Sequence, residues 1–185
     1  MAAYYLISQL PALDGIGDNV PLPITEERFV ELCGRFLKAK EQEKIRKLTI
    51  APPREQERSG SSFIDAWNER ERNLRFALGK VRAEKWELSF ETESRVLPGK
   101  YVRAAAAALE MENPMEAEKF LNRFRLEMLE EIRPTDSFSE EYLYYYGLRL
   151  KLLLRMRQFD TDAGEAVYRE IYRSILHKDR LEALS

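Results

Sequence analysis

The segment that most limits the fold of this chain is residues 139–158, SEEYLYYYGLRLKLLLRMRQ. Ser139 can cap the first turn of a helix here, and the acidic residues of that turn suit the positive end of a helix dipole. Apolar side chains occupy most sides of this helix, which predicts a central position with neighbours packed around it. Arg149, Lys151 and Arg155 interrupt the apolar region, whereas a membrane-spanning helix needs about 20 apolar residues in a row. We therefore expect a buried core helix and no membrane span.

Helical periodicity also runs through the rest of the second half of the chain. An alanine-rich helix at 99–111 allows close neighbours, and a helix at 113–132 begins with Asn113 as its cap and Pro114 at its first position. A last helix is expected at 160–177. Its apolar face is formed by Val167, Ile171 and Ile175. Together these segments predict a mainly α fold, a helical bundle.

The N-terminal half is less uniform. Residues 2–13 are apolar, and periodicity leaves open a short buried strand or an extended segment. A helix follows at 24–40, with Thr25 as its cap. Residues 86–90 alternate between apolar and polar side chains, which is typical of a strand. A short two-stranded β element, in which residues 4–10 pair with them, therefore accompanies the helical prediction.

A stretch rich in proline, serine, glycine and charge, TIAPPREQERSGSS, suggests how the chain is organised. It predicts a small N-terminal helical unit at 1–50, a linker at 51–62 and a helical bundle at 63–185. A single domain, with the N-terminal unit packed on the bundle, is the open alternative.

The charge balance and two scarce residue types exclude several classes of function. The chain has 30 basic and 32 acidic residues and a net charge of −2, so any basic face must be local. Cys33 is the only cysteine, which excludes a disulfide framework and a cysteine-based zinc site within one chain and fits a reducing, cytoplasmic compartment. His177 is the only histidine, which removes most histidine-based catalysis.

Sequence motifs for catalysis are also missing. The chain contains no GxSxG, no HExxH and no phosphate-binding glycine motif. Asp160, Asp162 and Gly164 resemble the start of a calcium loop, but the glycine comes too early and no glutamate follows at the twelfth loop position. We interpret Asp160 or Thr161 as a helix cap, and we expect no enzymatic activity, no cofactor and no metal ion.

The most unusual segment is the helix expected at 67–86, WNERERNLRFALGKVRAEKW. At 100° per residue, six of its residues share one narrow stripe. They are Asn68, Arg72, Arg75, Gly79, Arg82 and Trp86. Apolar positions border the stripe on both sides, so its arginines should be partly enclosed and should need acidic or carbonyl partners.

Two hypotheses about those partners remain open. Acids of a neighbouring helix could pair with the arginines, which is the common role of a single arginine on a helix face. The candidates are Glu116, Glu127 and Glu130. An external anion or a partner protein could do so instead. The residues predicted to bind a partner are then Asn68, Arg72, Arg75 and Arg82.

Four blocks of the sequence, taken in order, resemble a known family. The blocks are YYLISQLPAL, WNERERNLRFALGKVRAEKW, NPMEAEKFLNRFRLEMLEE and LRLKLLLRMRQFDTDAGEAVY. They resemble uncharacterised proteins encoded beside the subunits of bacterial V-type ATPases, and the resemblance covers most of the chain. It implies a non-enzymatic accessory or coupling subunit at the cytoplasmic face of the membrane. The implied partners are the central-stalk and membrane rotor-ring subunits.

The block RNLRFAL is also similar to helices of the C (or d) subunit of V/A-type ATPases. That subunit is a funnel of three helical bundles which sits on the rotor ring and receives the central stalk. A chain of 185 residues cannot supply three such bundles, so the resemblance implies a partial analogue or an assembly factor. The arginines would then grip an acidic partner helix. The alternative is an anion- or nucleic-acid-binding helical module that uses Arg72, Arg75 and Arg82, with salt-dependent binding.

Overall fold

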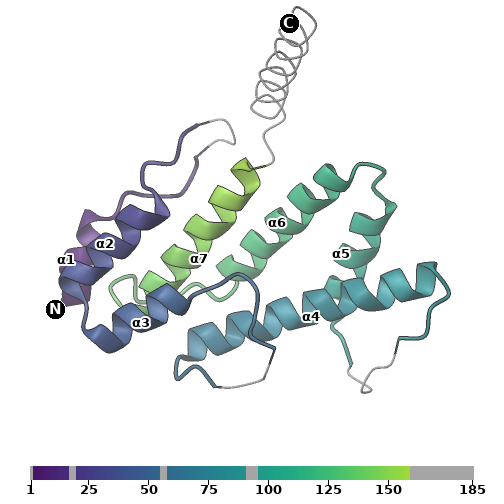
Figure 1. Ribbon diagram of the computed structural model, residues 1–185, viewed down its shortest axis with the longest axis horizontal. Coiled ribbons are helices and arrows are strands. Elements are labelled where there is room, and N and C mark those ends of the chain that lie inside the picture. Colours follow the sequence, from purple (N-terminus) through teal and green to yellow (C-terminus); the bar gives the residue numbers. More distant parts are fainter. Residues whose placement is uncertain (1, 17–19, 55–57, 91–95, 159–185) are drawn as a thin grey trace, which may run out of the picture.

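The computed structural model describes residues 2–16, 20–54, 58–90 and 96–158, and within them the chain forms seven α-helices (Figure 1). They are α1 (Ala2–Gln9), α2 (Glu26–Phe36), α3 (Ala39–Lys47), α4 (Ser62–Lys85), α5 (Gly99–Glu110), α6 (Pro114–Glu130) and α7 (Glu140–Arg157). The expected mainly α fold is confirmed for this part of the chain. None of these helices has the length and apolar character that a bilayer crossing demands.

Helix α7 is the centre of the bundle. It lies between α2 and α6 (Figure 1) and also contacts α1, α3 and α4. Ser139 caps it by accepting a hydrogen bond from the Tyr142 amide at 3.2 Å. Its buried residues are Leu143, Tyr144, Tyr145, Tyr146, Gly147, Leu148, Leu150 and Leu152. The prediction of a central, buried helix is confirmed.

The expected β element is wrong. Residues 4–9 belong to helix α1, and no strand is present in the ranges that the structure describes. The apolar side chains of this segment keep the three- or four-residue spacing of a helix that packs on a core. They are Ala3, Leu6, Ile7 and Leu10. Residues 86–90 are not paired as a strand either; they turn back along α4, as described below.

The larger hydrophobic core joins both sides of the segment 51–62. Its buried members before that segment include Phe29, Leu32, Cys33, Leu37, Ile45 and Leu48. After the segment, Phe63 and Trp67 from α4 and the apolar residues of α7 complete it. Trp67 also donates a hydrogen bond from Nε1 to the carbonyl oxygen of Ile50 at 3.3 Å. The N-terminal helices therefore pack directly on α7 and share one core with it.

A smaller core lies between α5 and the second half of α4, with α6 closing it. Its buried residues are Leu74, Ala77, Leu78, Tyr101, Ala105, Ala108, Leu121 and Met128. Alanines on α4 and α5 allow the two helices to approach closely, because they place only a methyl group at the contact. This packing holds α4 as a rigid support for the residues at its C-terminal end.

A buried ion pair joins α4 to α6. Glu71 follows Trp67 of the larger core by one turn and precedes Leu74 of the smaller core, and its side chain is fully buried. Arg125 meets it with two nitrogens, Nε at 3.1 Å from Oε2 and Nη2 at 3.2 Å from Oε1. This bidentate geometry is the strongest arrangement for an arginine and a carboxylate, and it compensates both charges inside the protein.

Further hydrogen bonds and ion pairs connect the Glu71–Arg125 pair to α7. Arg125 also donates from Nη1 to Asn122 Oδ1 at 3.0 Å, and the same nitrogen lies 3.5 Å from Glu118 Oε1. Glu118 in turn accepts a hydrogen bond from Arg155 of α7 at 2.7 Å. A chain of alternating charges thus ties α4, α6 and α7 together.

The single cysteine is a core residue. Cys33 is 1% exposed, and burial raises the pKa of its thiol to about 12. At about pH 8, where a free cysteine is partly ionised, the folded protein should hold almost no thiolate. We expect a thiol reagent such as DTNB to label the native protein at least about 100-fold more slowly than the protein in guanidinium chloride. Equal labelling rates, followed by absorbance, would contradict this burial.

The last predicted helix, 160–177, lies outside the described residues. The same is true of the helix cap expected at Asp160 or Thr161 and of His177.

Candidate functional site

The structure places the four predicted partner-binding residues in different environments along α4. Asn68 is 7% exposed. Arg72 is half-buried and donates from Nη2 to the carbonyl oxygen of Pro53 at 3.1 Å. The Arg75 side chain is 49% exposed and donates from Nε to Glu71 at 3.0 Å. Arg82 is exposed. Of these four residues, Arg75 and Arg82 are therefore the exposed ones.

The partners of these arginines differ from the acids expected from the sequence. Arg75 shares the buried Glu71 of its own helix with Arg125. Of the three acids considered, Glu130 pairs with Arg133 and Arg149 on another side of the bundle. Glu116 pairs with Lys119 of its own helix, and Glu127 is exposed. The arginines at the start of the stripe, Arg72 and Arg75, thus have partners within the protein, whereas Arg82 near its end is exposed to solvent.

Helix α4 ends in a Schellman motif, in which the chain reverses through one left-handed residue. Glu87 has a φ of 53° and is the only non-glycine residue of the described chain with a positive φ. The Leu88 amide donates to the Ala83 carbonyl oxygen at 2.9 Å, and the Glu87 amide to that of Glu84 at 3.4 Å. These two bonds are the signature of the motif. Leu88 nevertheless remains 63% exposed, although the apolar residue of such a motif commonly packs on its helix.

Phe90 anchors the reversed segment on α4. Its ring lies over Gly79, where a Cβ atom would come within 2.8 Å of the ring carbon Cζ. The ring also meets that of Phe76 edge to face, with centroids 5.4 Å apart. Gly79 lies between Arg75 and Arg82 on the stripe. Because it has no side chain, the Phe90 ring can pack directly on the helix backbone there.

The result is an exposed surface that combines cations and large apolar groups. We call it the α4-end surface and define it as Arg75, Arg82, Trp86, Leu88 and Phe90. Trp86 is 59% exposed and Phe90 is 40% exposed. Arg82 and Trp86 are four residues apart, which makes them neighbours on the helix surface. The strand predicted at 86–90 places Trp86, Leu88 and Phe90 on one of its faces, whereas in the structure they follow the reversal at the end of α4. Gly79 is the one signal in the sequence that a side chain packs on this stripe.

Because a left-handed conformation is unfavourable for a residue with a Cβ atom, the variant Glu87→Gly should stabilise the protein. We expect the free energy of unfolding to rise by about 0.5–1 kcal/mol, measured by urea denaturation. Glu84→Gly is the matched control, since it removes the same charge from within the helix and should cost about 1 kcal/mol. Destabilisation by both variants would show that position 87 is not left-handed in solution.

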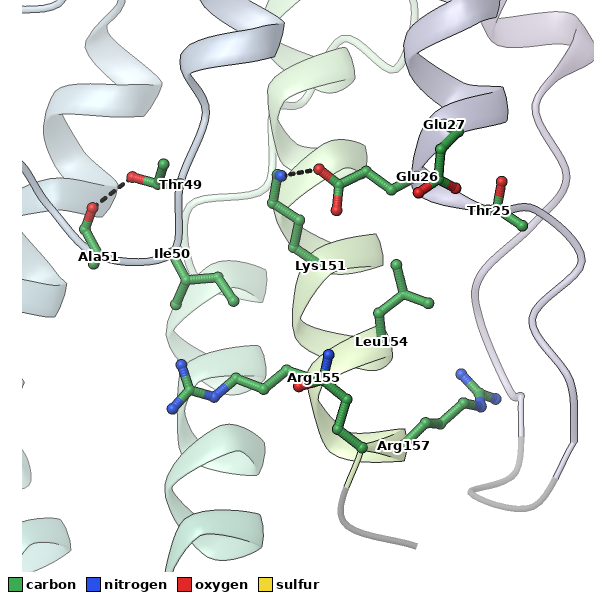
Figure 2. Close-up of a pocket in the computed structure, with 11 residues that line it drawn as sticks. Thr25, Glu26, Glu27, Thr49, Ile50, Ala51, Lys151, Leu154, Arg155 and Arg157 are labelled. Carbon is green, nitrogen blue, oxygen red and sulfur yellow. Dashed lines mark hydrogen bonds and ion pairs between the residues drawn. The ribbon is translucent and has the colours of Figure 1, made fainter. Parts of the chain in front are cut away.

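A cleft of about 890 Å³ lies between the start of α2, residues 49–51 and the end of α7 (Figure 2). Lys151, Arg155 and Arg157 line it, but each already has a partner. Lys151 pairs with Glu26, Arg155 with Glu118, and Arg157 donates to the Val20 carbonyl oxygen. Figure 2 shows Arg155 and Arg157 pointing to opposite sides of α7. The cleft therefore does not gather its cations around one point, as an anion site would.

Comparisons with known proteins found no matching family model, no matching curated protein and no matching solved structure. No group of three or more histidine, cysteine, aspartate or glutamate side chains is arranged for a metal ion among the described residues. The α4-end surface is therefore the candidate functional site of the described chain.

Proposed function

We propose that the chain is a non-enzymatic accessory or coupling subunit of a bacterial V-type ATPase, which acts by binding other subunits. The observation that carries this proposal is the α4-end surface, where Trp86, Leu88 and Phe90 are exposed beside Arg82. Tryptophan and arginine are enriched among the residues that dominate binding energy at protein interfaces. The choice of this complex is supported by the four ordered sequence blocks, which resemble proteins encoded with these ATPases.

The proposed place of the protein is the cytoplasmic face of the membrane, next to the central stalk and the rotor ring. A rigid bundle suits that role, since a subunit that transmits force or holds others in register needs a stiff body and an exposed contact. In the chain described here, two cores and a buried ion pair fix α4 against α5, α6 and α7. The role is then structural coupling or assembly, as a partial analogue of the C (or d) subunit.

The alternative is an anion- or nucleic-acid-binding module built on Arg72, Arg75 and Arg82. Arg72 and Arg82 are ten residues apart, which corresponds to about 15 Å along a helix, so they cannot hold one small anion together. Arg72 already donates a hydrogen bond to the carbonyl oxygen of Pro53. The geometry of the stripe favours an elongated partner.

The test of the proposed function is purification of a tagged copy from its own cells in mild detergent, with the co-purifying chains identified by mass spectrometry. We expect stalk and rotor-ring subunits of the V-type ATPase in a fixed ratio to the tagged protein. The matched control is the same tag on an unrelated helical protein expressed at the same level. Recovery of the protein alone, or with nucleic acid, would reject the proposal.

A further inference from the structure

We propose that the α4-end surface binds an acidic amphipathic helix of its partner, with Arg75 and Arg82 facing carboxylates and Trp86 and Leu88 facing apolar side chains. The identity of that partner as an ATPase subunit rests on the proposed function. The chemistry of the partner helix rests on the charges and exposed side chains of the surface alone.

The charge of the stripe is the first argument. Arg72, Arg75 and Arg82 lie on it, although the chain as a whole has a net charge of −2. The acid that Arg75 contacts, Glu71, is fully buried and also paired with Arg125, and Glu87 is the one exposed acid between Trp86 and Phe90. The nearby acid Glu84 points away from the stripe by helix geometry and pairs with Lys80 at 3.9 Å. The surface is therefore a local positive region, which attracts an acidic partner and repels a basic one.

The spacing of the arginines is the second argument. Arg75 and Arg82 are seven residues apart, which places them about 10.5 Å apart along the helix axis. Two carboxylates seven residues apart on a partner helix have the same spacing and face the same way. A partner helix that runs along α4 can therefore meet both guanidinium groups at once, while its apolar face reaches Trp86 and Leu88.

The third argument is that the apolar part of the surface is preorganised. Phe90 is seated on Gly79 and Phe76, and the Schellman motif fixes the reversal that presents Leu88. Ordered side chains lose less conformational entropy on binding than mobile ones. A duplex nucleic acid offers phosphates to the arginines but no apolar counterpart to Leu88, so these residues favour a protein helix over DNA or RNA.

The experiment is a fluorescence anisotropy titration of the full-length protein with labelled synthetic peptides of about 20 residues, long enough to form a helix in water. The acidic peptide carries glutamates at seven-residue intervals beside a leucine stripe, and the basic peptide has lysine at each of those glutamate positions. A labelled DNA duplex of similar length is the third probe. We expect the acidic peptide to bind at least about tenfold more tightly than either other probe.

Variants assign the binding to the surface. We expect Arg82→Glu, and separately the double variant Trp86→Ala with Leu88→Ala, to weaken binding of the acidic peptide at least about tenfold. Gly79→Ala should also weaken it, because the added methyl displaces the Phe90 ring, while the helix itself gains propensity. The controls are Arg46→Glu on α3, which reverses an exposed charge elsewhere, and Phe138→Ala before α7, which removes an exposed aromatic ring elsewhere. Both should bind as the unmodified protein does.

The outcomes separate this inference from the proposed function. Equal binding of the acidic and basic peptides, no binding of the acidic peptide at about 100 µM, or binding that survives the surface variants would overturn the inference. Tighter binding of the DNA duplex would overturn it in favour of nucleic acid. If the acidic peptide binds as expected but no ATPase subunit co-purifies with the protein, the proposed function fails and the inference stands. If ATPase subunits co-purify equally with the surface variants, the function stands and the inference fails.

Discussion

The variant Arg125→Ala is expected to lower the free energy of unfolding by roughly 3–5 kcal/mol. The physical reason is that Glu71 is fully buried and would lose its two-pronged partner, so that most of the compensation of its charge would disappear. Arg75 alone would remain beside it, and half of that side chain is in solvent. A domain of ordinary stability has about 5–15 kcal/mol in total, so the effect should be plain in a urea or thermal denaturation curve.

The control for this prediction removes both charges together. The double variant Glu71→Leu with Arg125→Met keeps similar volumes and leaves no unpaired charge at the contact of α4 and α6. Buried ion pairs replaced in this way are often neutral or even stabilising. We therefore expect the double variant to recover most of the stability that Arg125→Ala loses. A single variant within about 0.5 kcal/mol of the unmodified protein would show that water compensates Glu71 in solution.

The second large effect is expected from Trp67→Ala, which should cost roughly 3–5 kcal/mol. Trp67 is 0% exposed in the larger core, so its removal leaves a cavity. The variant also removes the hydrogen bond to the carbonyl oxygen of Ile50, which holds the start of the segment 51–62 against α4. Chemical denaturation monitored by circular dichroism measures the loss.

The chain supplies its own matched control, because it has two tryptophans and the other one is exposed. Trp86→Ala should change the free energy of unfolding by no more than about 0.5 kcal/mol, since Trp86 is 59% exposed. The same variant is expected to impair partner binding, so stability and binding should separate at the two tryptophan positions. Equal destabilisation by Trp67→Ala and Trp86→Ala would mean that Trp86 is buried in solution.

The helices with strong local signals were predictable from the sequence. The cap at Ser139 and the apolar character on most sides of 139–158 led to a buried central helix, and Asn113 with Pro114 marked the start of α6. The N-terminal segment was not predictable, because a short apolar run does not distinguish a helix from a strand by periodicity. The helix packs on α2 and on α7, and the residues of α7 lie more than 100 positions further along the chain.

The candidate site was predictable in part. A period of 3.6 residues places Arg75, Arg82 and Trp86 on one stripe, and the helix in the structure has that geometry. The burial of Glu71 was not predictable, because an acid among charged neighbours resembles a solvent-exposed residue and its partner Arg125 lies 54 residues further along the chain. The chain reversal at Glu87 was not predictable either, because glutamate seldom occupies a left-handed backbone conformation.

The arrangement of Glu71 has a consequence for how a partner can dock. One carboxylate holds two guanidinium groups, Arg125 from inside the bundle and Arg75 from its surface. A carboxylate of the proposed partner can therefore replace Glu71 as the hydrogen-bond acceptor of Arg75, while Arg125 still neutralises the charge of Glu71. When Arg75 changes its partner in this way, the buried charge of Glu71 remains paired with Arg125. A partner can therefore bind and dissociate without an unpaired charge inside the bundle.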